Sequence, residues 1–268
     1  MYSQISLQAS ANGDDGNTMR VTTAGLIGGL GPETTIDYYR RILAAWQAAD
    51  PTSAPSLIID SIDVQKVFRL VAADRAQLAD YLSDSVQRLA AAGADFAAIT
   101  ANMPHLVFDA VRERSPIPLV SIVATCADEA HRRGLRRVAL LGTRATMEAP
   151  MYPDALRRLG IDTVLPTAPE QVFIHDHYVG EMINGIFRDE VRERVIAIVG
   201  RLRDAEGIDG VILGGTELTL LLPTHTVAGL PALNTTALHV EAIVTRLRGR
   251  ADRRLQTSTG HEEEVPQL

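Results

Sequence analysis

The sequence has 268 residues, 46% of them hydrophobic and 22% charged, which is the composition of a folded globular protein with a sizeable core. Its formal net charge of −7 gives no support for a nucleic-acid partner, because such partners need a basic surface. The single cysteine, Cys126, excludes an intramolecular disulfide, and no apolar run approaches the roughly 20 residues of a membrane span, so we expect a cytoplasmic protein that binds no membrane.

Short apolar runs alternate along the chain with stretches whose apolar residues recur at helical spacing. The expected strands are residues 21–27, 57–60, 96–99, 116–120, 138–141, 163–166, 211–213 and 231–234. The expected helices are residues 33–46, 74–92, 122–133, 146–159, 169–186 (a helix or a lid), 191–203 and 236–247. This β-α-β alternation predicts an α/β fold in which mostly parallel sheets are flanked by helices.

An internal repeat divides the chain into two similar parts. The turns Gly93-Ala94-Asp95 and Gly207-Ile208-Asp209 each precede an apolar strand, at an offset of 207 − 93 = 114 residues. The same offset relates Gly28 to Gly142, and Tyr38 to Tyr152. We therefore expect two pseudo-symmetric α/β lobes with a cleft between them.

The expected boundaries follow from this repeat. Residues 19–118 together with 226–249 would form the first lobe, and residues 119–225 the second. Residues 1–18 and 250–268 are polar and are expected to be a disordered lead and a disordered tail.

Polar side chains gather just after two matched strands of the repeat. Asn102 and His105 follow the strand at 96–99, and Thr216 and Glu217 follow the strand at 211–213. Ligands of parallel sheets bind at the carboxyl ends of the strands. Asn102 and Thr216 could hold a carboxylate, with His105 and Glu217 as acid, base or orienting group. An equally weighted alternative is that these residues only cap helix starts.

The glycine-rich turn Gly28-Gly29-Leu30-Gly31-Pro32-Glu33 is a poor match to a dinucleotide-binding fingerprint. The third glycine position holds Thr34, and Pro32 removes a backbone donor. A tight strand-to-helix turn is one interpretation, and a small anion site formed by backbone and the hydroxyl of Thr34 or Thr35 is another.

The densest group of potential metal ligands is His175-Asp176-His177, and a His-x-His pair alone is weak support for a metal site. We expect no metal, and consider His177 either a surface residue or part of a lid over the cleft. Cys126 lies mid-helix among small apolar residues, which favours an inert core thiol over a nucleophile.

Several motifs, taken together and in this order, resemble the aspartate/glutamate racemase superfamily, and within it the aspartate racemase and broad-specificity amino-acid racemase branch. They are Gly25-Leu26-Ile27-Gly28-Gly29-Leu30-Gly31-Pro32-Glu33-Thr34-Thr35, Asn102-x-x-His105, Leu141-Gly142-Thr143-Arg144-x-Thr146-Met147-Glu148, Leu213-Gly214-x-Thr216-Glu217-Leu218 and Asn234-Thr235-Thr236-Ala237-Leu238-His239. The resemblance implies two pseudo-symmetric lobes, no cofactor and, commonly, a homodimer. It also implies one cysteine on each side of the substrate α-carbon.

The chain departs from this family at the residues that would react. The resemblance places the two cysteines at Ala101 and Gly215, neither of which can accept a proton. Met103 and Asn234 stand where the family has threonine and aspartate. We expect these replacements to make the cleft wider and more apolar, so that the ligand could be bulkier than aspartate.

Three hypotheses follow. The favoured one is a diverged, cofactor-independent enzyme that isomerises, eliminates, decarboxylates or cyclises a small, amino-acid-like carboxylate. The alternatives are a non-catalytic protein that binds such a carboxylate, and a racemase that uses bases other than cysteine. Candidates for proton transfer are His105, Glu217, Asp63, Tyr152 and His177. Candidates for substrate binding are Gly29, Thr34, Asn102, Thr143 and Thr216.

Overall fold

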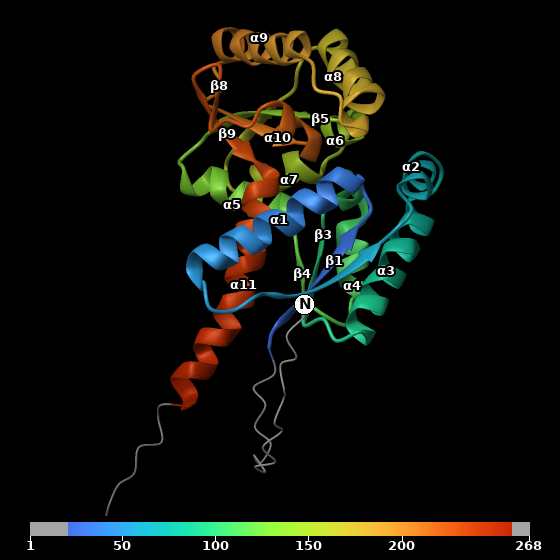
Figure 1. Cartoon of the computed structure of the whole chain (residues 1–268). Coiled ribbons are helices and arrows are strands. Elements are labelled where there is room, and N and C mark those ends of the chain that lie inside the picture. The colour runs from blue at the N-terminus through green and yellow to red at the C-terminus, as the bar shows by residue number, and fades with distance from the viewer. Residues whose placement is uncertain (1–20, 259–268) are drawn as a thin grey trace, which may run out of the picture.

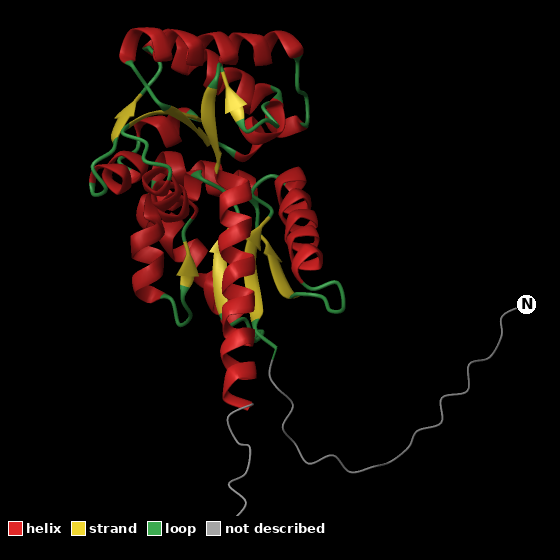
Figure 2. Ribbon diagram, turned by 90° about the vertical axis from the view of Figure 1, so that its left-hand side faces the viewer, coloured by secondary structure: helices red, strands yellow, loops and turns green. Residues whose placement is uncertain are grey.

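The computed structural model describes residues 21–258, with side chains as far as residue 249, and contains two sheets, each flanked by helices (Figures 1 and 2). This confirms the predicted α/β fold with parallel sheets and flanking helices. We call the four-stranded sheet with its helices the first lobe and the five-stranded sheet with its helices the second lobe. No helix in the described part of the chain is both long and apolar enough to cross a membrane.

The first lobe is built on a fully parallel sheet with strand order β2-β1-β3-β4. Its strands are β1 (Thr23–Gly28), β2 (Ser56–Ser61), β3 (Phe96–Ile99) and β4 (Leu119–Val120). Its helices are α1 (Pro32–Ala49), α2 (Val64–Ala73), α3 (Arg75–Ala91), the 3-10 helix η1 (Met103–Val107) and α4 (Phe108–Arg114).

The second lobe has strand order β6-β5-β7-β9-β8, parallel except that β8 runs antiparallel to β9. Its strands are β5 (Arg137–Gly142), β6 (Asp162–Val164), β7 (Gly210–Gly214), β8 (Thr226–Val227) and β9 (Leu230–Asn234). Its helices are α5 (Ile122–Arg132), α6 (Arg144–Glu148), α7 (Met151–Arg157), α8 (Ala168–Gly180), η2 (Met182–Asn184), α9 (Asp189–Glu206) and α10 (Thr216–Leu221). Helix α11 (Thr235–Ser258) begins beside β9 and runs along the first lobe (Figure 1).

Each sheet is buried on both faces, as the apolar strands require. In the first lobe, Leu26 and Phe96 pack on the side of α1 and α11, whereas Ile27 and Ile99 pack on the side of α3. Alternate strand residues point to opposite faces of a sheet, so one short strand supplies both layers of the core. The second lobe repeats the arrangement, with α5 and α7 on one face and α8, α9 and α10 on the other.

The repeat has a structural basis in its two aspartates. The backbone N–H of Asp95 donates to Thr23 O, and that of Asp209 donates to Arg137 O, each at 2.8 Å. Each carboxylate also accepts from the opposite strand: Asp95 from Thr23 N at 2.9 Å, and Asp209 from Arg137 N at 3.1 Å. The Gly-x-Asp turns therefore align β3 with β1 and β7 with β5, so that the matched strands end level with one another.

The described elements differ from the expected boundaries at three points. Strand β9 pairs with β7 in the second lobe, although residues 226–249 were expected in the first lobe. Strand β4 pairs with β3 in the first lobe, although the second lobe was expected to begin at residue 119. Helix α11 continues to Ser258, so the expected disordered tail is helical from residue 250 to that point. The expected lead, residues 1–18, and residues 259–268 lie outside the described residues.

His239 joins α11 to two other elements of the first lobe. The Tyr38 hydroxyl of α1 donates to Nδ1 of His239 at 2.9 Å, and Nε2–H of His239 donates to Val120 O of β4 at 3.1 Å. This pairing needs the neutral ring, protonated on Nε2. Burial lowers the pKa of His239 from 6.5 to about 4.

We expect Asp209→Ala to lower the free energy of unfolding by about 1–2 kcal/mol, because it removes a charged acceptor from the backbone N–H groups of Arg136 and Arg137. Denaturant unfolding measures the change. Asp162→Ala, at the exposed start of β6, is the matched control and should cost less than about 0.5 kcal/mol. Equal losses in the two variants would contradict this role of Asp209.

We expect stability to fall as the pH decreases from about 6.5 towards 4, because the unfolded His239 takes up a proton in this range and the folded one does not. His239→Asn should therefore reduce the slope of unfolding free energy against pH by about 1.4 kcal/mol per pH unit between these values. Denaturant unfolding at a series of pH values checks this. Leu247→Ala, which truncates a buried residue of the same helix, should lower stability without changing the slope.

Candidate functional site

A small cavity lies between the lobes, at the ends of β3 and β7 where the polar residues were expected to gather. Its volume is about 40 Å³, enough for one or a few water molecules and far below the roughly 300–1,000 Å³ of ordinary ligand pockets. The lining residues come from both lobes: Leu30, Gly31, Val64, Phe68, Ala101, Asn102, Met103, Pro104, Thr143, Thr146, Tyr178, Ile183, Gly214, Thr216 and Glu217. The cavity is therefore too small for an amino acid as it stands, and its walls must move apart to admit a substrate.

Glu217 is the charged centre of this cleft. Its side chain is buried, and three hydroxyl groups surround its carboxylate. Thr34 Oγ1, from the first lobe, lies 3.0 Å from Oε1, and Thr216 Oγ1 donates to Oε2 at 2.7 Å. The hydroxyl of Tyr178 also donates to Oε2. These donors offset the free-energy cost of taking a carboxylate out of water. The hydrogen bond from Thr34 also ties the carboxylate of Glu217 to the first lobe.

Tyr178, on α8, is a site residue that the sequence interpretation missed. Its ring covers Gly215, so a Cβ atom added there would lie 2.5 Å from Tyr178 Cε2 and 2.9 Å from Tyr178 Oη. The expected widening of the cleft at Gly215 is therefore wrong, because the ring fills that space. Burial, and next the charge of Glu217, raise the pKa of Tyr178 well above its usual value, which keeps the phenol protonated.

Asn102 is held in place from both sides. The Tyr152 hydroxyl donates to Asn102 Oδ1 at 2.5 Å, and Asn102 Nδ2 donates to Thr235 Oγ1 at 3.2 Å. One hydrogen of Nδ2 then stays available for a ligand in the cleft. Tyr152 is thus a buried support for Asn102 and does not line the cavity itself.

Thr143 and Thr146 line the second-lobe side of the cleft. Thr143 caps α6, since its hydroxyl oxygen accepts from Thr146 N at 3.3 Å, and the two hydroxyl oxygens lie 3.1 Å apart. Both side chains are buried. Their hydroxyls and the amide of Asn102 form a neutral polar set suited to an anionic group.

His105 was expected to transfer protons, and the structure places it differently. Its Nδ1–H donates to Ala101 O at 2.9 Å, its Nε2 accepts from Ile122 N at 3.3 Å, and its ring stacks on Phe108. Burial, and then the nearby His239, lower its pKa to about 3, so the ring is neutral. Because both ring nitrogens are hydrogen-bonded to backbone groups, His105 stabilises the turn that contains Ala101.

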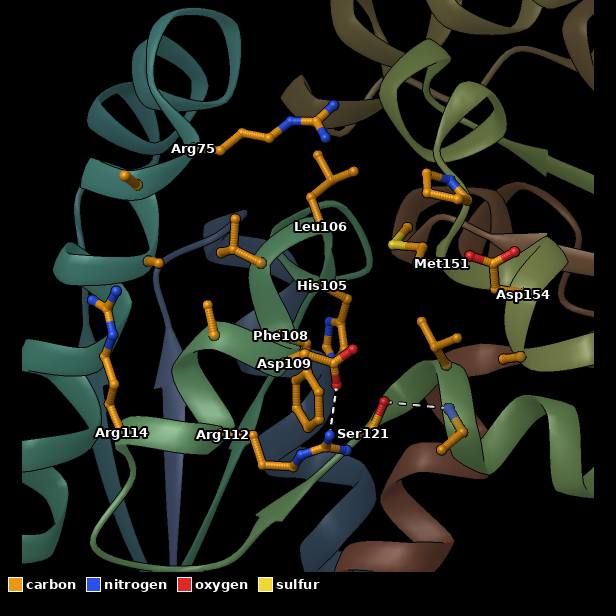
Figure 3. A pocket seen from close by; sticks show the side chains of 18 of the residues that line it. Arg75, His105, Leu106, Phe108, Asp109, Arg112, Arg114, Ser121, Met151 and Asp154 are labelled. Atoms are coloured by element: carbon orange, nitrogen blue, oxygen red, sulfur yellow. Dashed lines mark hydrogen bonds and ion pairs between the residues drawn. The ribbon is translucent and has the colours of Figure 1, made fainter. Parts of the chain in front are cut away.

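His105 borders a second, larger cavity of about 550 Å³, outside the cleft. Figure 3 shows it opening beside Leu106 and Phe108, with Arg75, Arg112 and Arg114 around it. Arg112 pairs with Asp109 at 2.9 Å, and Arg114 pairs with Asp80.

Three further candidates do not line the cleft. Asp63 caps α2 by accepting from Gln65 N and Lys66 N, and its side chain is 56% exposed. Gly29 has a positive φ of 79° and donates its N–H to Thr35 Oγ1 at 2.9 Å, which leaves that donor unavailable to a ligand. His177 lies beside Glu181, with 3.2 Å between Nδ1 and Oε2, and is partly exposed.

The sequence did contain a signal for Tyr178. Adjacent helix residues point about 100° apart, so Tyr178 faces the cleft while His177 faces away. The buried residues of α8 are Ile174 and Tyr178, four positions apart, which marks one face of the helix. The sequence interpretation considered this segment for the cleft, but through His177 and not through Tyr178.

Cys126 and the candidate metal ligands are separate from the cleft. Cys126 is buried in the core between α5 and the second sheet, and burial raises the pKa of its thiol, which favours the unreactive form. Among the residues that the structure describes, no three His, Cys, Asp or Glu side chains are grouped so that they could hold a metal ion.

Comparison with known proteins identifies the family. The chain is 31% identical to an aspartate racemase homologue from Pyrococcus horikoshii, whose structure superposes with a TM-score of 0.73 over 85% of this chain and 99% of that one. A Yersinia pestis protein assigned to the Asp/Glu racemases gives 30% identity and a TM-score of 0.78 over the same shares. The broad-specificity amino-acid racemase of Bacillus subtilis is 20% identical over 82% of this chain and 96% of its own length. Because residues 27–243 match the family model described as Asp/Glu/Hydantoin racemase, the chain belongs to that family.

Proposed function

We propose that this chain is a cofactor-independent enzyme that performs acid/base chemistry, without thiols, on a small amino-acid-like carboxylate. The reaction classes open to such a site are isomerisation, elimination, decarboxylation and cyclisation. We also expect a homodimer in the cytoplasm, as the family resemblance and the composition suggest.

The observation that carries the proposal is the buried carboxylate of Glu217 in a cleft without cysteine. Ala101 and Gly215, where the resemblance places the family's thiols, offer only a methyl group and a hydrogen atom. Glu217 lies next in the chain to Thr216 and accepts hydroxyl hydrogen bonds from both lobes. Such a carboxylate can receive a proton from a bound substrate or return one to it.

Neutral donors support the proposed substrate class. Asn102, Thr143 and Thr146 present an amide and two hydroxyls without a negative charge of their own. A substrate carboxylate bound by them would meet hydrogen-bond donors that carry no charge. The remaining walls, Leu30, Val64, Phe68, Met103, Pro104 and Ile183, are apolar and would exclude water once the lobes close.

A non-catalytic binding protein is the second candidate, and one observation favours it. The polar groups of the cleft already satisfy one another, since Thr34, Thr216 and Tyr178 all bond to Glu217 and Tyr152 bonds to Asn102. A site of this kind could close around a ligand without reacting with it.

We expect Glu217→Gln to lower turnover by at least about 100-fold while changing the affinity for ligand only slightly, because the amide keeps the shape of the side chain and loses the base. Calorimetry with both enantiomers of aspartate and glutamate, and with succinate and glutarate, identifies ligands, and NMR on long incubation detects their conversion. Glu193→Gln, on the exposed side of α9, is the matched control and should leave both quantities unchanged. Saturable binding with no conversion in the wild type would instead support the non-catalytic alternative.

A further inference from the structure

We propose that Tyr178 is the group of the second lobe that exchanges protons with the substrate, and that this exchange takes place on one face of the substrate only. The inference rests on the proposed function of the cleft and adds to it the reacting residue and the stereochemical outcome.

Tyr178 occupies the space in front of Gly215. Residue 215 has an extended backbone with φ −157°, which any amino acid adopts, so the backbone does not require glycine there. What excludes a side chain is Tyr178, whose Cε2 and Oη lie 2.5 and 2.9 Å from the site of a Cβ atom. The phenol oxygen therefore occupies the place from which a side chain at position 215 would reach the substrate.

Tyr178 is hydrogen-bonded to a group that can take up its proton. Its hydroxyl donates to Glu217 Oε2, so a proton can pass between them without movement of either residue. When the substrate loses its α-hydrogen as a proton to Tyr178 Oη, the phenol proton moves to Glu217 Oε2. The electron pair of the broken C–H bond stays on the substrate, and the charge of Glu217 is neutralised. The reverse transfer restores the substrate and both side chains, so no oxidant or other reactant is needed.

The first-lobe wall of the cleft contains no side chain that could exchange protons with a substrate. Of the fifteen residues that line the cavity, Tyr178 and Glu217 alone have ionisable side chains. The first lobe contributes the methyl group of Ala101, the apolar side chains of its neighbours and the neutral amide of Asn102. Inversion of a carbon centre by proton transfer needs an acid on the face opposite the base. This cleft has an acid/base pair on one face, so a substrate that loses its α-proton regains it with the same configuration.

To test this, the full chain is incubated in D₂O with L-aspartate, D-aspartate, L-glutamate or D-glutamate, each in a separate sample. Calorimetry measures binding, ¹H NMR follows replacement of the Cα hydrogen by deuterium, and chiral chromatography follows configuration. We expect at least one of the four to be deuterated with its configuration kept. The opposite enantiomer appearing as fast as deuterium would overturn one-sided exchange. Binding without exchange would overturn the role of Tyr178, and the conversion assay described above would then decide separately between an enzyme and a binding protein. Binding of none of the four would contradict the proposed function and this inference together.

Tyr178→Phe isolates the hydroxyl, because the ring that covers Gly215 is retained. We expect the exchange rate to fall at least about 100-fold, with the dissociation constant of the bound amino acid within about twofold of the wild type. Tyr38→Phe removes the hydroxyl of another buried tyrosine, outside the cleft, and should leave the exchange rate unchanged. Full exchange in Tyr178→Phe would overturn the assignment.

A double-mutant cycle tests the position of Tyr178 without any activity measurement. Gly215→Ala should lower the melting temperature by several degrees, because the added Cβ atom meets the ring of Tyr178. In the Tyr178→Ala background the same change should lower the melting temperature only slightly. Gly200→Ala on α9 has open space, with its nearest neighbour at 3.9 Å, and should not lower the melting temperature. An equal loss from Gly215→Ala in both backgrounds would show that Tyr178 does not fill this position.

Discussion

The closed cleft depends on one buried charge, the carboxylate of Glu217. A carboxylate taken out of water is stable only when donors surround it, and here the donors come from different parts of the chain. Thr34 belongs to α1 of the first lobe, Tyr178 to α8 of the second, and Thr216 immediately precedes Glu217 on α10. Thr34 thereby links the first lobe to Glu217 in the second lobe across the cleft. Opening the lobes separates Thr34 from the carboxylate, so an entering ligand must supply interactions that replace this one.

The rest of the fold places these groups opposite one another. The two Gly-x-Asp turns align the matched strands of each sheet, and the residues after β3 and β7 therefore meet at the cleft. His105 then fixes the turn at Ala101 through two backbone hydrogen bonds, and Tyr152 fixes Asn102. Some polar residues near the cleft thus face the cavity, and others hold the cavity-facing residues in position.

The sequence was sufficient to predict the α/β fold because its apolar runs are short, regularly spaced and separated by clear helical patterns. It was also sufficient to predict that Asn102, Thr216 and Glu217 come together, because strand ends of a repeat meet at one edge. It could not predict that β9 joins the second sheet, since a buried apolar strand looks the same in either sheet. Likewise, it could not distinguish His105 as a support, because burial and backbone partners decide whether a histidine titrates. The replacements at Ala101 and Gly215 suggested a wider cleft, and only the packing of α8 revealed that Tyr178 fills one of the two places.

The most direct test of the central claim, that Tyr178 and Glu217 form the reacting side of the cleft, is a crystal structure with a bound amino acid. We predict the ligand carboxylate on Asn102 and Thr143, the Tyr178 hydroxyl still bonded to Glu217, and Tyr178 Oη within about 3.5 Å of the ligand α-carbon. A ligand held in the arginine-lined cavity beside Phe108, or a Tyr178 ring turned away from Gly215 in the closed complex, would contradict it.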